Sequence, residues 1–404
     1  MNLQFMHVVD YWVGIPLCAV LSIVERVRAR VMPAVSAPPR RMLLIELSEM
    51  GSAVLAYPAI REAVDRLGAD NVWFMIFERN REGVEVLGIL PRDHIITVSD
   101  RSFPSFLTTL SAALRRCRRE RLDAAVDLEI FSRCTALLTW LSGARRRAGL
   151  SAGDNEGLYR GSLFTHPVLY SPHHHMTRTY LTLVRATFAD APAGEPLSKE
   201  PIGDVPPSLP EFRASADVVA SVDHLVSGLP SGTRLVFLNP DAGLLPLRAW
   251  PTAHFAALAR LLVDADPAVV VAVTGVERTR ALGDEILTGL PSGRGLNLAG
   301  RTRNLSELIE LLSRGQVLVT IDSGPAHFSG LTPIARIVLF GPETPALYAP
   351  IGEHVDVAFT NLPCSPCYSA ANHRSSPCTD NQCLKRITPA DIAARVQRAL
   401  GAAA

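Results

Sequence analysis

An alternation of short apolar runs with helical segments, repeated in two series, is the feature that most constrains the fold. The first series has amphipathic segments over 58–67 and 106–122 and contains the apolar runs MLLIEL, NVWFMIF, HIITV and AAVDLEI. The second series contains RLVFLNP, AVVVAVTG, QVLVTID and RIVLFGP. Short apolar strands separated by helices predict parallel sheets covered on both faces. We therefore expect an α/β protein with two doubly wound, Rossmann-like domains.

The length of the chain and a proline-rich stretch divide these two series. A chain of 404 residues favours two domains over one. Residues 192–210 contain six prolines and little periodicity, which is typical of a linker. We predict an N-terminal segment and linker over 1–40, a Rossmann-like domain over 41–205, a second one over 206–385 with a cysteine-rich loop at 361–384, and a C-terminal helix over 386–404.

The first forty residues differ from the rest. Residues 11–24 are almost wholly apolar and are followed by Arg26, Arg28 and Arg30. The run is short for a membrane span, which needs about twenty apolar residues, and a signal peptide has its cations before the apolar run. We expect a helical hairpin or an amphipathic helix in the inner leaflet of a membrane, with its arginines at anionic headgroups. The alternative is an extra helix packed on the first domain.

Composition and absent motifs exclude several functions. Hydrophobic residues make up 48% of the chain, charged residues make up 20%, and the net charge is +1. Neither a disordered chain nor a nucleic-acid-binding protein is expected from these values. No G-x-G-x-x-G motif follows a strand and no G-x-x-x-x-G-K-[ST] motif occurs, which argues against a dehydrogenase and a kinase.

The strand QVLVTID runs into the loop SGPAHFSGL, which opens a helix. A helix N-terminus at the carboxyl end of a parallel strand binds anions through its unpaired N–H groups and its dipole. Gly324 permits close approach of the backbone, Ser323 adds a hydroxyl group, and His327 lies one turn into the helix. The alternative is that Asp322 only caps the helix.

This loop and its surroundings resemble glycosyltransferase family 9, the heptosyltransferase family of lipopolysaccharide assembly. The resemblance covers most of 42–389 and rests on VTIDSGPAHFSGLTPIARIVLFGPETPALYAP, LRAWPTAHFAALA, LAGRTRNLSELIELL and MLLIELSEMGSAVLAYPAI. In the family an Asp-(Ser/Thr)-Gly-x-x-His loop holds the diphosphate of a nucleotide sugar, which implies this role for residues 322–327, Pro325 included. The family also implies a GT-B architecture: two Rossmann-like domains facing across a cleft, with the donor in the second and the acceptor in the first.

The resemblance implies substrates and a location. The default donor is ADP-heptose, and the acceptor is the lipopolysaccharide core or another lipid-linked molecule. The protein would lie peripherally on the cytoplasmic face of the inner membrane and would need no cofactor for catalysis. We therefore predict an inverting glycosyltransferase that moves a sugar, heptose by default, from a nucleotide diphosphate donor to such an acceptor.

Two further residues are assigned to the donor by the resemblance. Arg248 stands where the family usually has a lysine before a Trp-Pro pair, and a guanidinium group suits phosphate. Glu277 matches the region that contacts the nucleoside, where a carboxylate pairs with ribose hydroxyl groups. The alternatives are a solvated surface arginine and a helix N-terminal acid.

The sequence departs from the family at the presumed general base. The loop after the first strand reads EMGSAV, so Ser52 replaces the family's usual aspartate. A serine without a partner base is a poor proton acceptor at neutral pH. Glu49 is the candidate replacement; the alternatives are a solvent-facing acid at Glu49 and a helix N-cap at Ser52. Ser52 also supports a second hypothesis, a catalytically degenerate homologue that binds nucleotide sugar or glycolipid without turnover.

A polar stretch near the end of the first domain borders the acceptor side in the family. Arg160 and His166 are therefore candidates for contacting an anionic or hydroxyl-rich acceptor, and a structural role is the alternative for each. The segment GARRRAG, at 143–149, is interpreted as a solvated turn, with contact to lipid phosphate as the alternative.

Four of the seven cysteines lie in one loop with the pattern C-x2-C-x10-C-x4-C: Cys364, Cys367, Cys378 and Cys383. Four thiols in one loop favour a structural metal, zinc ahead of iron–sulfur. A set of buried thiols or one disulfide is the alternative.

Overall fold

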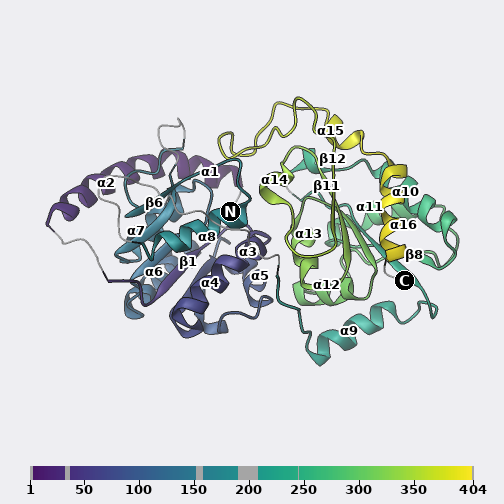
Figure 1. Cartoon of the computed structure of the whole chain (residues 1–404), viewed down its shortest axis with the longest axis horizontal. Coiled ribbons are helices and arrows are strands. Elements are labelled where there is room, and N and C mark those ends of the chain that lie inside the picture. The colour runs from purple at the N-terminus through teal and green to yellow at the C-terminus, as the bar shows by residue number, and fades with distance from the viewer. Residues whose placement is uncertain (1–2, 32–36, 152–157, 190–207, 244, 403–404) are drawn as a thin grey trace. The chain divides into compact units, whose positions relative to one another are not determined.

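The computed structural model describes residues 3–31, 37–151, 158–189, 208–243 and 245–402. They divide into two compact units: unit 1 is Met1–Pro206 and unit 2 is Pro207–Ala404. Each unit contains one sheet with helices packed against it (Figure 1).

Unit 1 is built on a six-stranded parallel sheet in the order β3-β2-β1-β4-β5-β6. Its strands are β1 Met42–Ile45, β2 Val72–Phe77, β3 Ile95–Val98, β4 Ala124–Asp127, β5 Arg146–Ser151 and β6 His166–Leu169. In the central strand β1, Met42 pairs with Val72 on one side and with Ala124 on the other. All four residues of β1 are buried, which explains its continuous apolar run, because helices cover a parallel strand on both faces.

Helices pack against both faces of this sheet. They are α3 Ser52–Leu55, α4 Tyr57–Leu67, α5 Glu82–Glu85, α6 Phe103–Arg119, α7 Arg133–Leu141 and α8 Met176–Ala186. On one face, Leu43 of β1 shares a buried apolar cluster with Cys117 of α6 and Leu138 of α7. Helices α4 and α8 contact each other and are joined by an ion pair of 2.8 Å between Glu62 Oε2 and Arg185 Nη2.

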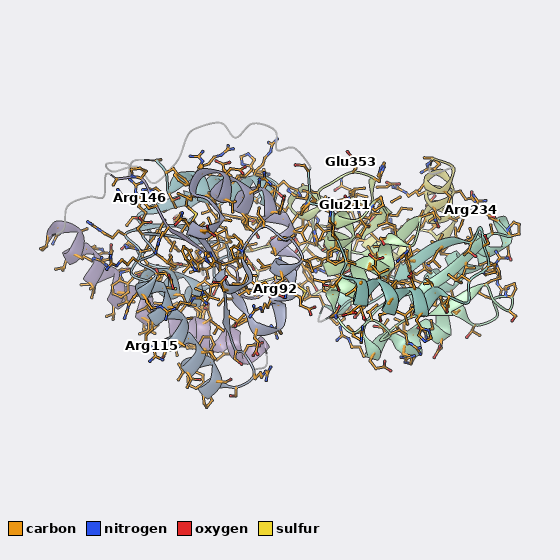
Figure 2. The ribbon with its side chains drawn as sticks, turned by 90° about the horizontal axis from the view of Figure 1, so that it is seen from below. Arg92, Arg115, Arg146, Glu211, Arg234 and Glu353 are labelled. Atoms are coloured by element: carbon orange, nitrogen blue, oxygen red, sulfur yellow. The ribbon has the colours of Figure 1, made fainter. Side chains whose placement is uncertain are left out.

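The interpretation of 143–149 as a solvated turn is wrong. Strand β5 begins within it, and Arg146 (labelled in Figure 2) and Arg147 are 2% and 1% exposed. Backbone carbonyl groups satisfy the buried guanidinium groups: Arg146 Nη1 donates to Thr187 O at 2.8 Å, and Arg147 Nε donates to Leu163 O at 2.7 Å. Hydrogen bonds of this kind offset much of the cost of removing a charge from water.

Unit 2 repeats the topology in the order β12-β11-β10-β7-β8-β9, again all parallel. Its strands are β7 Arg234–Asn239, β8 Val269–Val273, β9 Gly295–Asn297, β10 Val317–Ile321, β11 Ala335–Phe340 and β12 Val355–Phe359. Its α-helices are α9 Ala216–Val226, α10 Thr252–Ala265, α11 Arg280–Leu287, α12 Leu305–Ser313, α13 Gly324–Phe328, α14 Pro345–Tyr348, α15 Gln382–Lys385 and α16 Pro389–Ala402. Side chains of β7 alternate between two cores: Val236 and Leu238 pack with α10 and α16, and Leu235 and Phe237 pack with α9 and α12.

The chain order reverses between two neighbouring central strands in each sheet. These strands are β1 and β4 in unit 1, and β7 and β10 in unit 2. In open α/β sheets, ligands bind outside the carboxyl ends of the strands at such a reversal. The loops that follow these four strands are therefore the first places to look for a functional site.

Two helices precede β1: α1 Leu3–Trp12 and α2 Gly14–Val31. Helical hydrogen bonds cross their junction, from Val13 N to Val9 O at 2.9 Å and from Leu17 N to Val13 O at 3.2 Å. The predicted hairpin is therefore wrong, because the chain does not turn back between the two helices (Figure 1). By length and composition alone, Val8–Val31, with a mean hydropathy of 1.7, is long and apolar enough to cross a membrane.

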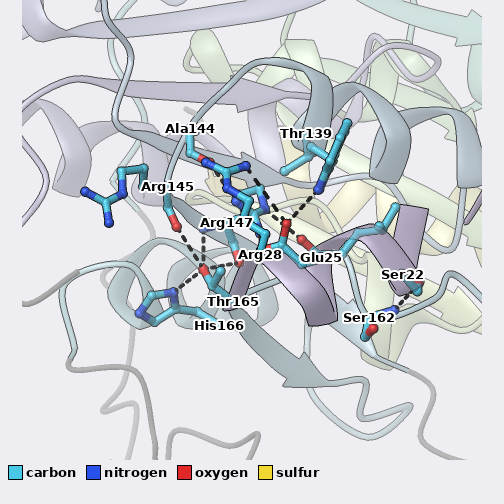
Figure 3. A network of polar contacts seen from close by, with 12 residues as sticks. Ser22, Glu25, Arg28, Thr139, Ala144, Arg145, Arg147, Ser162, Thr165 and His166 are labelled. Atoms are coloured by element: carbon cyan, nitrogen blue, oxygen red, sulfur yellow. Dashed lines mark hydrogen bonds and ion pairs between the residues drawn. The ribbon is translucent and has the colours of Figure 1, made fainter. Parts of the chain in front are cut away.

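Polar side chains attach α2 to the body of unit 1 (Figure 3). Glu25 Oε2 accepts a hydrogen bond of 2.8 Å from Trp140 Nε1, and Glu25 Oε1 forms an ion pair with Arg147. Ser22 Oγ accepts a hydrogen bond of 2.8 Å from Ser162 N. The segment is thus an extra helix packed on the first domain, which was the alternative expectation.

The outer side of the same segment is apolar. Trp12 is 71% exposed, and the exposed large apolar residues are Val8, Tyr11, Trp12, Val13, Leu17, Val20, Ile23, Val24, Val27 and Val31. Arg26 and Arg30 are exposed at the end of α2. The segment therefore carries an apolar face that the described part of unit 1 leaves uncovered.

We expect Glu25→Ala to lower the free energy of unfolding by about 2–3 kcal/mol, because it leaves the buried Arg147 guanidinium without its carboxylate. The retained carbonyl partners of Arg147 keep the loss below the roughly 3–5 kcal/mol typical of a broken buried pair. Urea denaturation followed by Trp fluorescence measures the change. Glu353→Gln, at a side chain that is 85% exposed, is the control, and equal shifts for the two variants would contradict the prediction.

Candidate functional site

The predicted diphosphate loop lies at the chain reversal of unit 2. Strand β10 ends at Ile321, and α13 begins at Gly324 with Ser323 as its N-cap residue. Ser323 makes no side-chain capping bond; its hydroxyl oxygen lies 3.2 Å from Thr320 Oγ1. Asp322 is 5% exposed. It lies one residue before the N-cap position, so it is not the simple capping aspartate of the alternative.

Arg248 connects the loops that follow β7 and β10. It ends the 3-10 helix η4 Pro246–Arg248, and its Nη2 atom lies 3.4 Å from Asp322 Oδ2. The same atom lies 3.5 Å from Oε2 of Glu343, which follows β11. The side chain of Arg248 is 16% exposed, so it is not the solvated surface arginine of the alternative. Two carboxylates and one guanidinium group therefore meet at this edge of the sheet.

Burial raises the pKa of both carboxyl groups. Burial raises the pKa of Glu343 to about 8; the charge of Asp322 adds to the increase and Arg248 opposes it. Burial also raises the pKa of Asp322, and Arg248 again opposes the shift. Protonation of either group reduces the negative charge beside Arg248, which makes the cluster more favourable for an anion.

Three buried polar atoms at this edge have no hydrogen-bond partner among the described residues, and one of them, Asp322 Oδ2, has the ion pair with Arg248. The other two are Arg248 Nε and Asn239 Oδ1, at the end of β7. The amide of Asn239 contacts Thr274 through Nδ2, at 3.3 Å from Thr274 O. Unsatisfied buried groups are costly in a protein interior, and such groups at the reversal of the sheet suit a ligand that supplies their partners.

Sequence reasoning missed Glu343 and its second partner, Arg374 of the cysteine-rich loop. Arg374 Nε lies 3.3 Å from Glu343 Oε2. Glu343 could have been found, because it follows an apolar run that pairs in parallel with β10 and so ends at the same edge. No sequence signal links Arg374 to this place, because a long irregular loop carries it.

Glu277 lies beyond the carboxyl end of β8, in the 3-10 helix η5 Glu277–Thr279 just before α11. Its side chain is 70% exposed and forms an ion pair of 2.7 Å with Arg280 Nε. The hydrogen bond from Arg280 lowers the pKa of Glu277. Its carboxylate is therefore ionised at neutral pH and accessible from solvent.

Glu49 and Ser52 contact each other at the carboxyl end of β1. Ser52 Oγ donates a hydrogen bond of 2.9 Å to Glu49 Oε2. Ser52 is buried and is the first residue of α3, with Gly51 at the N-cap position, so it is not the N-cap of the alternative. Glu49 is half-buried, so the structure brings a carboxylate to the hydroxyl group of Ser52.

A buried carboxylate that sequence reasoning missed fixes this loop. Glu129, beyond the end of β4, accepts hydrogen bonds from Leu47 N at 2.9 Å and from Ser48 N at 2.7 Å through Oε1. Its Oε2 accepts a bond of 2.9 Å from Ser48 Oγ. Burial raises the pKa of Glu129, and the hydrogen bonds from Ser48 oppose the shift. Glu129 thereby holds the backbone immediately before Glu49.

Arg160 and His166 lie inside unit 1, 4% and 4% exposed. Arg160 forms a buried ion pair with Asp127 at the end of β4, and burial lowers the pKa of Arg160 to about 10. His166 begins β6, and its Nδ1 lies 2.8 Å from Thr165 Oγ1. Both residues have structural partners, and their contact with an acceptor stays a prediction.

The structure keeps all four cysteines of the loop as free thiols, and only Cys383 is buried. The disulfide alternative is therefore not what the structure has. Within the described ranges, no three His, Cys, Asp or Glu side chains lie together so as to hold a metal ion. This arrangement does not support the predicted structural metal.

Comparison with known proteins identifies the family of the chain. The model of glycosyltransferase family 9 (heptosyltransferase) matches residues 111–376, more than half of the chain. Lipooligosaccharide heptosyltransferase 2 of Haemophilus influenzae is 33% identical over 121 residues, 29% of this chain and 34% of that protein. Lipopolysaccharide heptosyltransferase 2 of Escherichia coli is 30% identical over 132 residues, 32% and 37% of the two chains. The aligned part spans only about a third of these relatives' length.

Solved structures resemble most of the chain. The E. coli ADP-heptose lipopolysaccharide heptosyltransferase II has a TM-score of 0.65 and 20% identity, covering 89% of this chain and 98% of that one. An E. coli heptosyltransferase solved with ADP has a TM-score of 0.60 and 17% identity, covering 89% and 99%. The predicted α/β fold of two Rossmann-like units, the GT-B fold of these enzymes, is confirmed. From the family match and this fold together, the chain belongs to glycosyltransferase family 9.

Proposed function

We propose that this protein is an inverting glycosyltransferase that moves a sugar, heptose by default, from a nucleoside diphosphate donor to the lipopolysaccharide core or another lipid-linked acceptor. The observation that carries the proposal is the cluster of Arg248, Asp322 and Glu343 at the chain reversal of unit 2. A solved heptosyltransferase of the same fold contains ADP, which supports ADP-heptose as the donor. In this proposal unit 2 binds the donor and unit 1 binds the acceptor.

The donor chemistry requires stabilisation of a departing diphosphate. Breaking the bond between the sugar and the diphosphate leaves additional negative charge on the phosphate oxygens, and a fixed cation in a water-poor site stabilises it. Arg248 supplies the guanidinium group, and Asp322 and Glu343 hold that group in place. The loop of Ser323, Gly324, Pro325 and His327 directly follows Asp322 in the chain. Glu277, ionised and exposed, is suited to the ribose hydroxyl groups.

The acceptor chemistry requires a base. Attack by an acceptor hydroxyl group is assisted when a carboxylate removes its proton. Glu49 is the proposed base in unit 1, and Ser52 orients its carboxylate through the hydrogen bond to Oε2. Glu129 positions the loop by holding Leu47 N and Ser48 N. The carboxylate of Glu49 would thus act as the general base in place of the family's aspartate, where this chain has Ser52.

A binding protein without turnover is the second candidate function. The observation that favours it is Ser52, since a serine cannot itself act as the base. This candidate keeps the donor cluster of unit 2 and predicts nucleotide binding without sugar transfer. A turnover assay on lipid-linked acceptors separates the two functions.

The exposed apolar face of α1 and α2 is proposed to lie on the cytoplasmic face of the inner membrane. Apolar side chains on one side of a helix bind the boundary between headgroups and acyl chains, and arginines add attraction to anionic lipids. Trp12 is suited to this boundary because its side chain combines a large apolar ring with a polar indole N–H group. Attachment through Glu25 and Ser22 would hold the acceptor unit at the surface where a lipid-linked acceptor lies.

We expect Arg248→Ala to weaken ADP binding about 10- to 100-fold, because a hydrogen bond to a charged group contributes roughly 1.5–3 kcal/mol. Arg248→Lys retains the charge and should lose less. Isothermal titration calorimetry measures the affinities. Arg398→Ala, at an exposed position of α16, is the control, and an unchanged affinity in Arg248→Ala would remove this residue from the donor site.

Glu49→Gln should lower kcat about 10²- to 10⁴-fold, the usual contribution of a general base, while the affinity for ADP stays the same. Ser52→Ala should have a smaller effect, because it removes only the orienting hydrogen bond. Release of ADP from ADP-heptose in the presence of acceptor measures kcat. Asp70→Asn, at an exposed acid of unit 1, is the control. Full activity of Glu49→Gln would exclude Glu49 as the base.

Replacing Trp12 and Ile23 by Ser should reduce binding to vesicles containing phosphatidylglycerol about tenfold or more, since burial of each apolar side chain contributes roughly 1.5–3 kcal/mol. Co-sedimentation measures the bound fraction. Leu107→Ser changes a side chain that is 45% exposed outside this segment and serves as the control. Equal binding by the double variant and the wild type would contradict a membrane role for this face.

A further inference from the structure

One buried carboxylate contacts two arginines that lie far apart in the sequence. Glu343 Oε2 is 3.5 Å from Arg248 Nη2 and 3.3 Å from Arg374 Nε. Glu343 is 1% exposed, whereas the side chains of Arg248 and Arg374 are 16% and 23% exposed. Both guanidinium groups therefore retain some surface toward solvent, while the carboxylate that they share does not.

The cysteine-rich loop holds Arg374 at this position. Cys367 N and Tyr368 N both donate hydrogen bonds to Pro342 O, at 2.9 and 2.8 Å, so the loop is attached immediately before Glu343. Arg374 N donates to Ser369 O at 3.1 Å, and the guanidinium carbon of Arg374 lies 5.3 Å from the centre of the Tyr348 ring. The loop thus has a definite contact with the donor cluster, although its thiols form neither a disulfide nor a described metal site.

The distances between carboxylate oxygens and guanidinium nitrogens in this cluster are long. Distances of 3.3–3.5 Å are longer than the 2.7–2.9 Å of a strong charge-assisted hydrogen bond. Arg248 Nε has no hydrogen-bond partner among the described residues. Guanidinium groups match phosphate oxygens in a planar, paired geometry, so a diphosphate offers these arginines better partners than Glu343 does.

We propose that Arg374 is a second diphosphate-binding cation of the donor site, and that Glu343 is a positioning residue that holds Arg248 and Arg374 until the diphosphate replaces it as their partner. This inference rests on the proposed donor site in unit 2. As the diphosphate oxygens accept the N–H groups of the two arginines, Glu343 Oε2 takes a proton from solvent. This proton transfer forms one O–H bond at Oε2 and breaks the bond to hydrogen in the hydronium ion or buffer acid that supplies the proton; no other covalent bond changes.

Burial is the main cause of the raised pKa of Glu343, and charged or titratable groups also face its carboxyl group. They are Asp322 after β10, Arg248 of η4, and Arg374 and Tyr368 of the cysteine-rich loop; Thr344 N also donates to Glu343 Oε1 at 3.4 Å. Burial already raises the pKa of Glu343 to about 8. A diphosphate adds negative charge nearby and raises this pKa further, so binding near pH 8 is coupled to proton uptake.

The first test compares the affinities of variants for ADP and for adenosine, which has the same base and ribose but no phosphate. Arg374→Ala should weaken ADP binding about tenfold and leave adenosine binding unchanged, while Arg374→Lys loses less. Arg386→Ala removes an exposed arginine that follows the same loop and is the control. Equal affinities of Arg374→Ala and Arg386→Ala for ADP would overturn the role of Arg374.

The second test measures proton uptake by titrating ADP at pH 8 in two buffers of different ionisation enthalpy. The wild type should take up a larger fraction of a proton than Glu343→Gln, whose amide cannot titrate. Equal uptake would overturn the role of Glu343. If no nucleoside diphosphate binds to the wild type, the donor assignment fails and this inference fails with it, whereas normal ADP binding with unaffected variants overturns the inference alone.

A melting series checks that Glu343→Gln still folds. A carboxyl group whose pKa is higher in the folded state than in the unfolded state stabilises the fold at low pH, and this contribution is lost as pH rises through about 8. The Tm of the wild type without ligand should therefore fall more between pH 6 and pH 9 than the Tm of Glu343→Gln. Parallel curves would contradict a buried, titrating Glu343.

Discussion

Parallel pairing of strands around a chain reversal is the constraint on which both sites depend. Because parallel strands end at the same edge, residues from separate parts of the chain meet there. In unit 1 this brings Glu129, after β4, to the loop after β1. In unit 2 it brings Arg248, after β7, to Asp322 after β10 and to Glu343 after β11. A shift of one strand in either sheet would separate these groups.

The two units stabilise buried carboxylates in different ways. Glu129 receives its hydrogen bonds from the backbone and side chain of one short loop, so it makes that loop rigid. Glu343 instead shares its charge with two arginines at longer distances. A carboxylate held by backbone N–H groups has partners that a ligand cannot remove, whereas guanidinium partners can be transferred to a competing anion. The arrangement at Glu129 is suited to positioning a loop, and the arrangement at Glu343 is suited to an exchange of partners between the carboxylate and a bound anion.

Much of the fold could be predicted from periodicity, but not the strands that lack an apolar pattern. Runs such as MLLIEL and QVLVTID are buried on both faces and correspond to β1 and β10. Strand β5 was missed because three successive arginines are typical of a solvated turn. Arg145 is exposed, whereas carbonyl groups and a carboxylate from distant segments make the burial of Arg146 and Arg147 possible. The short edge strand β9, of three residues, has no buried side chain, so it has no apolar signal.

The sequence by itself determined the two alternating series, the family resemblance and the loop of Asp322, because local patterns encode all three. It also identified Glu49 as the carboxylate nearest to Ser52 along the chain. Their hydrogen bond depends on the conformation of the folded loop. Only the tertiary structure decided that Glu343 and Arg374 join Arg248, and that Arg147 is buried against Glu25. These contacts join segments far apart in the chain, and their burial sets their charge and partners, which local sequence does not encode.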